Sequence, residues 1–369
     1  MNVSVGIVGL PGVGKTALFN ALTHRSTSGG GRSTMATVPV PDERLDVLAS
    51  MFKPKRVVPA GVQMVDVAGL VKGGSQEGGL GGQFLGQLQS VTALAVVLRC
   101  FPRPDIGFGP EPAQPLADLE TILLELQLSD LSRIDRRLER TSKAARGRDA
   151  VAQREEQTLQ ALRAALDAGK SARSAGVPEA DTVSLKDLSL TTLKPMIFVA
   201  NVAEGQLGAL YDPDVPDETG VRSMLAGLQD AAEQNEAQVA VVSAQLEAEL
   251  AELDEADARE YLSSLGVTDT GLSRFIGAAY RELGLLTYFT AGDPEARAWT
   301  VRQGARAPEA AGVIHSDIER GFIRAEVTPF AQLVEAGSAA KAKELGYTRL
   351  EGKDYVMQEG DVVYFRFNV

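Results

Sequence analysis

The sequence predicts an α/β fold: a P-loop domain with a mostly parallel sheet, an inserted antiparallel helical hairpin, and a small C-terminal α+β domain. Continuous apolar runs of strand length predict a parallel sheet that is buried on both faces. A glycine-rich motif at 9–16 follows the first run directly and precedes a segment, 17–22, that is able to form a helix. The apolar runs are Val3–Val8, Val62–Val65, Leu94–Leu98, Met196–Val199 and Val239–Val242.

A helical hairpin is predicted between the third and fourth of these runs. Apolar residues mostly recur there at three- and four-residue steps, which is helical periodicity. Residues 144–149 have the composition of a hairpin tip, and the apolar stripe resumes after them. We expect the stripe to form the hairpin's own seam rather than a groove for a partner. Its members are Leu119, Ile122, Leu123, Leu126, Leu131, Ile134, Leu138, Leu159, Leu162 and Leu166.

After Gly284 the pattern changes to short strands around one or two helices, which predicts a separate small α+β domain. The expected strands are Leu285–Thr290, Val313–His315, Gly321–Val327 and Val362–Phe367. The resulting boundaries are 1–117 and 190–283 for a discontinuous P-loop domain, 118–189 for the helical insertion, and 284–369 for the C-terminal domain.

The composition is that of a globular protein, with 44% hydrophobic and 23% charged residues. The N-terminus lacks the basic stretch and cleavage site of a signal peptide, and no apolar run approaches the roughly 18 residues that span a bilayer. The single cysteine, Cys100, excludes an internal disulfide and a thiolate metal cluster. We therefore expect a cytoplasmic protein without a membrane partner, and a monomer.

The net charge of −12 is unevenly distributed along the chain. Residues 201–260 hold fifteen acidic and two basic side chains, which accounts for the whole excess. The run 133–148, which leads into the predicted hairpin tip, holds seven basic side chains against Asp135 and Glu139. This basic run favours a solvated helix face, or a surface that meets the phosphates of a nucleic acid.

The motif at 9–16 fits G-x-x-x-x-G-K-[ST], whose backbone N–H groups converge on a phosphate. Gly9 and Gly14 permit backbone angles and close approaches that a Cβ would block. Lys15 is expected to reach the β- and γ-phosphates, and the Thr16 hydroxyl to bind Mg²⁺. The predicted phosphate-binding residues are Gly12, Val13, Gly14, Lys15, Thr16 and Ala17.

A second motif, Asp66-Val-Ala-Gly69, follows the apolar run Val62–Val65 and matches the D-x-x-G of switch-type NTPases. Asp66 is expected to hold Mg²⁺ through water, and the Gly69 N–H to sense the γ-phosphate. Together with Lys15 they are the predicted catalytic residues. The glycine-dense residues 71–82 continue from them as a mobile switch loop or a flexible linker. Leu70 stands where relatives of this fold place a water-orienting Gln, so hydrolysis is expected to be slow.

The third motif, Asn201-Val-Ala-Glu204, stands where GTPases carry N-K-x-D after a strand. The Asp of that motif accepts from guanine N1–H and N2–H₂, whereas adenine presents no donors there. Val202 replaces the Lys and the longer Glu204 replaces the Asp, which weakens guanine selectivity and favours ATP. A GTPase remains the alternative. The backbone of Ser243, Ala244 and Gln245, after the next strand, is expected to touch the base.

Over essentially its full length the chain resembles the Obg-like ATPases of the YchF group, which are TRAFAC P-loop NTPases. The matching stretches include GIVGLPGVGKTALFNALT, VDVAGLVKGGS, ANVAEG, TYFTAG, ERGFIRAEV and the C-terminal EGKDYVMQEGDVVYFRFNV. The resemblance implies a P-loop G domain, an inserted coiled coil and a C-terminal TGS domain. It also implies hydrolysis of ATP in preference to GTP, with Mg²⁺, and association with the ribosome.

Three departures from the family pattern bear on turnover. Gly12 replaces the Asn that helps to hold a monovalent cation in potassium-assisted relatives. Switch I is shortened to 26–37, so that Thr34, Thr37 or neither binds Mg²⁺. Phe108 replaces a His that is a candidate for assisting hydrolysis. The second alternative is therefore a nucleotide-gated ribosome- or RNA-binding module with negligible hydrolysis. Outside these motifs, Trp299 is expected to be a core residue rather than a base-stacking platform.

Overall fold

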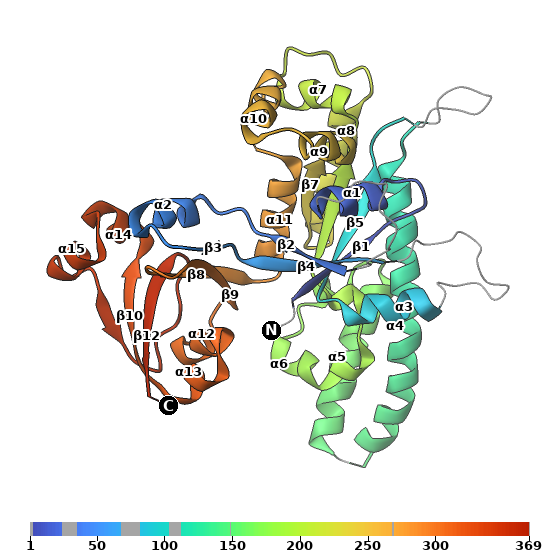
Figure 1. The fold of residues 1–369 in the computed structure, drawn as a ribbon. Coiled ribbons are helices and arrows are strands. Elements are labelled where there is room, and N and C mark those ends of the chain that lie inside the picture. The colour runs from blue at the N-terminus through green and yellow to red at the C-terminus, as the bar shows by residue number, and fades with distance from the viewer. Residues whose placement is uncertain are drawn as a thin grey trace. The chain divides into compact units, whose positions relative to one another are not determined.

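The computed structural model describes residues 3–23, 35–67, 82–102, 112–147, 149–267 and 269–368 (Figure 1). The chain folds into two compact units, which we describe separately. Unit 1 comprises Met1–Val3, Thr37–Gln63 and Leu283–Val369, and unit 2 comprises Ser4–Ala36 and Met64–Glu282. Among the described residues, no helix combines the length and the apolar character that a transmembrane span requires.

A mixed α/β fold with a mostly parallel sheet forms unit 2, as predicted. The six strands follow the order β2-β4-β1-β5-β6-β7, and β1, β5, β6 and β7 pair in parallel. The end of β2, from Thr37, and the start of β4, to Gln63, are counted with unit 1. β1, β5 and β6 are buried along their whole length, which explains their continuous apolar sequence. The strands are β1 (Ser4–Val8), β2 (Met35–Pro39), β4 (Gly61–Asp66), β5 (Ala93–Arg99), β6 (Met196–Asn201) and β7 (Gln238–Val242).

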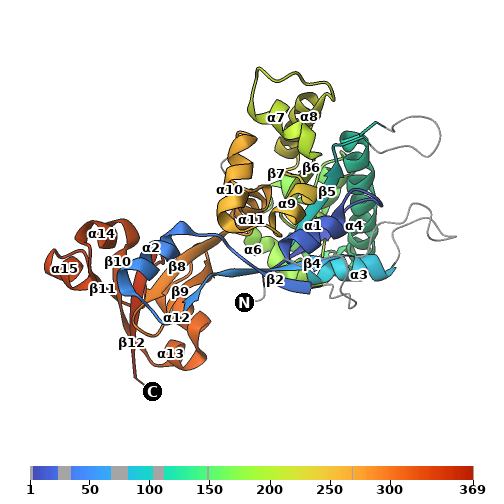
Figure 2. The same ribbon diagram turned by 45° about the horizontal axis from the view of Figure 1, so that its top comes forward.

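Helices connect the strands of this sheet, as parallel pairing requires. Figures 1 and 2 show α1 next to α9, and these two helices follow the loops after β1 and β7. The helices between its strands are α1 (Lys15–Leu22), α3 (Gly82–Ser90), α7 (Leu207–Tyr211) and α8 (Val221–Gln234), with the 3-10 turn η4 (Glu204–Gln206). After β7, the last strand of this sheet, come α9 (Ala244–Leu250), α10 (Glu255–Ser264) and α11 (Gly271–Glu282).

Two long helices, α4 (Pro115–Ala145) and α5 (Ala150–Asp167), pack side by side in unit 2 (Figure 1). The Asp149 side chain caps α5 by accepting from the N–H of Val151 at 2.9 Å. The apolar stripe lies in the seam, where Ile134 contacts a buried cluster that includes Leu159 and Leu162. The chain then returns to the sheet through η1 (Ala172–Ala175), α6 (Glu179–Thr182), η2 (Val183–Leu188) and η3 (Thr191–Leu193).

Unit 1 contains a mixed sheet with the order β11-β10-β12-β8-β9-β3. Its buried core includes Tyr288, Val327 and Phe365. The strands are β3 (Val57–Val58), β8 (Leu285–Ala291), β9 (Ala296–Arg302), β10 (Phe322–Pro329), β11 (Arg349–Glu351) and β12 (Asp361–Phe367). The helices are α2 (Glu43–Phe52), α12 (Ala307–Ile314), α13 (Ser316–Arg320), α14 (Phe330–Ala336) and α15 (Ala339–Glu344).

The structure differs from the sequence-based expectations at several places in unit 1. The expected strand Val313–His315 is wrong, because Val313 and Ile314 end the helix α12, whose first turn is closed by Glu309 accepting from the Arg306 N–H at 2.6 Å. β9 and β11 are absent from the expected strands, although the alternation of alanine with arginine at the start of β9 is typical of a half-buried strand. Four helices, α12 to α15, stand where one or two are expected. Residues 37–63, which the predicted boundaries assign to the P-loop domain, pack in unit 1 with the C-terminal residues.

Candidate nucleotide-binding site

The loop between β1 and α1 has a conformation that requires glycine. Gly14 precedes the first residue of α1 with φ of 95°, and a Cβ there would lie 2.2 Å from Nδ2 of Asn201. Gly12 has φ of 78°, also in the left-handed region that glycine adopts without strain. Val13 between them is buried, whereas Thr16 and Ala17 in the first turn of α1 are exposed. The loop therefore presents its backbone and the start of α1 to solvent.

Lys15 folds back on this loop. Its Nζ donates to the carbonyl oxygen of Gly9 at 2.7 Å and to that of Leu10 at 3.0 Å. Burial lowers the pKa of Lys15, and the negative charge of Asp66 partly opposes that shift. The loop lysine and the carboxylate at the end of β4 thus lie close enough to interact.

Several predicted residues lie outside the described part of the chain. They are Gly69 and Leu70 of the D-x-x-G segment, Thr34 of switch I, Phe108, and most of the two predicted switch segments, 26–37 and 70–82. Thr37 is described; it lies in β2 and belongs to unit 1.

Asn201 connects three loops of unit 2. Its Nδ2 donates to the carbonyl oxygen of Val13 at 2.9 Å, and its Oδ1 accepts from the N–H of Ala244 at 3.0 Å. The side chain is 4% exposed, so both hydrogen bonds are shielded from water. The amide therefore fixes the phosphate loop against the segment after β7.

Glu204, the predicted base-reading carboxylate, already has a partner. Its Oε1 accepts a hydrogen bond from the hydroxyl of Tyr261 on α10, and this bond raises the pKa of Tyr261. Val202 is buried and its N–H donates to the carbonyl oxygen of Val242 at 2.9 Å, so it presents no polar side chain. Sequence reasoning missed Tyr261, because nothing in the acidic stretch around it distinguishes this tyrosine.

Ser243, Ala244 and Gln245 lie where β7 meets α9. Ser243 is buried, and its Oγ has no hydrogen-bond partner among the described residues. Gln245 is exposed, with its Nε2 donating to Oε1 of Glu249 at 3.1 Å. The structure thus brings these residues to the same end of the parallel sheet as Asn201 and the phosphate loop, where ligands bind in open α/β sheets.

The residues present fit a Mg²⁺ ion that is bound mainly by water and phosphate. Among the described residues, no cluster of three His, Cys, Asp or Glu side chains is able to hold a metal by itself. Mg²⁺ characteristically uses one or two protein oxygens and keeps several waters. The Thr16 hydroxyl and the Asp66 carboxylate supply hard oxygen donors of this kind.

The basic run at the end of α4 divides into internal and external side chains. Arg133 donates to the carbonyl oxygen of Ser189 at 2.9 Å, and Arg137 pairs with Glu155 at 2.7 Å and with Asp187 at 2.8 Å. These two arginines hold the hairpin together. Arg136, Arg140, Lys143 and Arg146 are exposed and have no carboxylate partner within the described residues.

Comparisons with known proteins cover the whole chain. Residues 4–140 match a family model described as "50S ribosome-binding GTPase", and residues 285–368 match the YchF-GTPase_C model, described as "Protein of unknown function (DUF933)". The Bacillus subtilis (strain 168) protein called "Ribosome-binding ATPase YchF" is 43% identical, and the Haemophilus influenzae protein of the same name is 42% identical, with 100% of each chain covered.

Among solved structures, the YchF GTPase of Schizosaccharomyces pombe is similar, with a TM-score of 0.87 at 29% sequence identity. The match covers 99% of this chain and 98% of that chain. The resemblance inferred from the sequence is therefore confirmed, as is the mixed α/β fold.

Proposed function

Because this chain belongs to the YchF family of ribosome-binding ATPases, we propose that it is a Mg²⁺-dependent nucleotide switch that hydrolyses ATP and associates with the ribosome. The observation that supports this most directly is Asn201, which joins the phosphate loop at Val13 to the loop at Ala244. A phosphate site and a base site built on one rigid frame is what a nucleoside triphosphate requires. Ribosome association also favours a cytoplasmic location, and we propose that the protein acts as a monomer.

In this proposal Lys15 exchanges its two carbonyl acceptors for phosphate oxygens. Phosphate oxygens carry negative charge, so the ammonium forms an ion pair with them that a neutral carbonyl oxygen cannot provide. Thr16 and Asp66 hold the Mg²⁺ ion, which neutralises charge on the β- and γ-phosphates when it is bound. Gly69 and Thr34 of switch I complete the phosphate site.

The base site favours adenine over guanine in this proposal. Bidentate recognition of guanine needs both oxygens of a carboxylate, and one oxygen of Glu204 accepts from Tyr261. Val202 offers no lysine stem to cover the base. The alternative is an Obg-type GTPase, in which guanine displaces the Tyr261 hydroxyl from Glu204.

Paired calorimetric titrations with Mg·ATP and Mg·GTP test the base preference. The wild-type protein is expected to bind ATP more tightly, and the double variant Val202→Lys with Glu204→Asp to shift the ratio toward GTP by about tenfold. Gln245→Ala, which changes an exposed side chain of the neighbouring loop, is the control and should leave the ratio within about twofold. Tighter binding of GTP by the wild type would establish the GTPase alternative.

Turnover is proposed to be slow, because Leu70 has no polar group to orient water and Phe108 replaces the candidate His. Single-turnover hydrolysis of ATP with and without ribosomes separates the ATPase from the nucleotide-gated module. Stimulation by ribosomes supports the ATPase. Nucleotide-dependent ribosome binding without any stimulation would favour the module with incidental hydrolysis.

We also propose that the exposed basic side chains near the end of α4 contact ribosomal RNA. Arg136, Arg140 and Lys143 recur at helical spacing and present charge that no described carboxylate neutralises. Arg136→Glu with Arg140→Glu should weaken ribosome cosedimentation and flatten its salt dependence, because fewer counterions are released. Lys341→Glu with Lys353→Glu makes the same charge change on exposed residues of unit 1, outside this helix. Equal loss in both variants would show an effect of net charge alone.

A further inference from the structure

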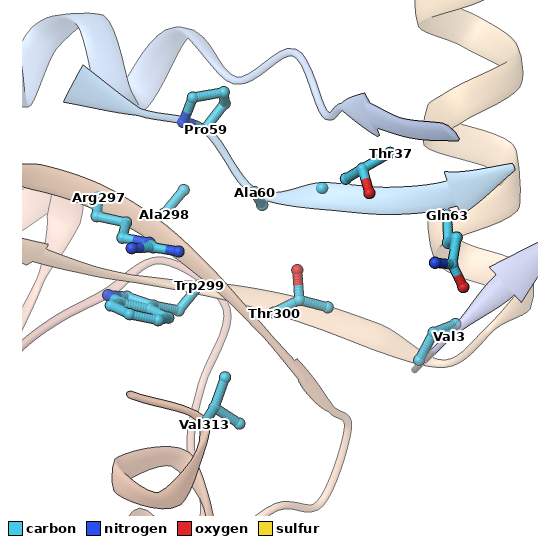
Figure 3. Close-up of a pocket in the computed structure, with 11 residues that line it drawn as sticks. Val3, Thr37, Pro59, Ala60, Gln63, Arg297, Ala298, Trp299, Thr300 and Val313 are labelled. Atoms are coloured by element: carbon cyan, nitrogen blue, oxygen red, sulfur yellow. The ribbon is translucent and has the colours of Figure 1, made fainter. Parts of the chain in front are cut away.

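Unit 1 contains a pocket of about 290 Å³ that lies apart from the phosphate loop in sequence and in unit (Figure 3). It opens beside β9, where β3 stops pairing with it. The two strands pair only at Val57 with Ala296 and at Val58 with Arg297. Pro59 follows and has no N–H to continue the ladder. One side of the pocket is therefore the edge of β9, and the other is the segment from Pro59 to Gln63.

A cation without a hydrogen-bonded partner faces this pocket. The guanidinium of Arg297 lies over the indole ring of Trp299, with 4.0 Å from Cζ to the ring centroid (Figure 3). The nearest carboxylate oxygen, Oε1 of Glu295, is 3.7 Å away, beyond hydrogen-bonding distance. Oε2 of Glu295 accepts from Nε of Arg56 at 2.7 Å. The Glu295 carboxylate therefore binds Arg56 directly and neutralises Arg297 only in part.

One donor of Arg297 has no acceptor among the described residues. Its Nε is shielded from solvent and has no hydrogen-bond acceptor among the described residues. A buried charged donor without an acceptor is costly, and such groups are normally paired with protein, water or a ligand. Stacking on Trp299 fixes the plane of the guanidinium, so that its fork is already oriented for an incoming anion.

Polar groups on both walls complete the site. The hydroxyls of Thr37 and Thr300 point toward one another across the pocket, and the amide of Gln63 lies at its far end (Figure 3). Ala298 and Val313 supply apolar contacts. The volume is close to the lower end of the ~300–1,000 Å³ that small-molecule sites occupy.

We propose that this pocket binds a small organic anion, whose carboxylate or phosphate group pairs with Arg297 and whose short body contacts the threonine hydroxyls and the apolar wall. The guanidinium fork matches the geometry of both groups, because each offers two negatively charged oxygens to its paired N–H donors. A bound ligand also contacts Thr37, the last residue of the predicted switch I segment.

Trp299 is the only tryptophan of the chain, so its fluorescence reports directly on this pocket. The probes are pyruvate and acetate as carboxylates, and glycerol 3-phosphate and inorganic phosphate as phosphates. Each is titrated to about 10 mM in the presence of Mg·ADP, which keeps the phosphate loop occupied. A saturable change with either class supports the proposal, and the class that binds more tightly identifies the group.

The variants locate the binding. Arg297→Gln should weaken the affinity at least tenfold, and Thr37→Val a few-fold, since it removes one hydroxyl and keeps the shape. Arg302→Gln, at the exposed end of the same strand, is the matched control and should bind as the wild type does. Thermal unfolding confirms that each variant is folded. No saturable change with any probe, or equal affinity in Arg297→Gln, would overturn the proposal.

Discussion

The Asn201 side chain donates a 2.9 Å hydrogen bond to the carbonyl oxygen of Val13, a residue 188 positions earlier in the chain. This bond joins the end of β6 to the phosphate loop, and the same amide accepts from Ala244. The loop at Val13 and the loop at Ala244 both obtain a buried hydrogen bond from the Asn201 side chain. Asn201 is thus a positioning residue for the phosphate and base loops alike.

Asn201→Ala is expected to destabilise the protein and weaken nucleotide binding together. The substitution leaves the Val13 carbonyl and the Ala244 N–H buried without partners, which costs about 2–4 kcal/mol of unfolding free energy. Urea unfolding measures that loss, and titration with Mg·ATP should show at least about a tenfold weaker affinity. Unchanged ATP affinity in a folded variant would show that the loop holds its shape without the amide.

Gly14 is required for two reasons, the space that a Cβ would need and its positive φ. Comparing Gly14→Ala with an alanine variant of another glycine of positive φ separates the two. A Cβ at Gly14 would meet Nδ2 of Asn201 at 2.2 Å, and its φ of 95° disfavours any other residue. Gly220 is the matched control, because its φ is 70° and nothing lies within 4 Å of its Cβ position. Gly220→Ala should cost about 1–2 kcal/mol and leave nucleotide binding intact. Gly14→Ala should cost more and abolish binding; similar effects in both variants would contradict this.

Local patterns in the sequence predicted the sheet of unit 2 and the phosphate loop. Buried parallel strands have continuous apolar sequences, which are visible within one segment. The requirement for Gly14 is also local, because it comes from the backbone conformation of the loop between β1 and α1. Tyr261 and Glu204 could not be paired in this way, because they are 57 positions apart and their contact depends on how α10 packs. Periodicity reports only which face of one segment is apolar.

The same limit explains residues 37–63. Their place in unit 1 depends on distant contacts: Arg44 pairs with Glu359, Arg56 with Glu295, and Val57 with Ala296 in a two-residue ladder. None of these contacts leaves a pattern in its own segment. The Val313–His315 error arose because a three-residue apolar run is compatible with a strand or with the end of a helix.

Tyr261→Phe is expected to raise the affinity for GTP relative to ATP. It removes the hydroxyl that occupies Oε1 of Glu204, so both carboxylate oxygens become available for the two guanine donors. We expect a shift of about two- to fivefold in the ratio of dissociation constants, well below the effect of replacing Glu204 itself. Competition titrations of the two nucleotides measure the ratio. An unchanged ratio would show that Glu204 does not contact the base.

The buried carboxylate of Asp130 on α4 gives a stability effect with a definite pH dependence. Its Oδ2 accepts from the N–H and the hydroxyl of Thr192, both at 2.7 Å, while Oδ1 has no partner among the described residues. Burial raises the pKa of Asp130, although the hydrogen bonds from Thr192 and the charge of Arg133 oppose the shift. The neighbouring Lys194 is lowered to a pKa of about 8 by its own burial.

Because the folded pKa of Asp130 lies above the unfolded value, the native state binds more protons between the two. The contribution of Asp130 to the unfolding free energy must therefore fall as the pH rises through that window. Asp130→Asn removes this titration, so the variant should gain stability relative to the wild type as the pH is raised from about 4 to about 8. Asp135→Asn removes an exposed carboxylate from the same helix and serves as the control. Urea unfolding at several pH values in this range measures the effect. If the unfolding free energies of the wild type and Asp130→Asn change with pH in parallel, Asp130 has the same pKa in the folded and unfolded chain.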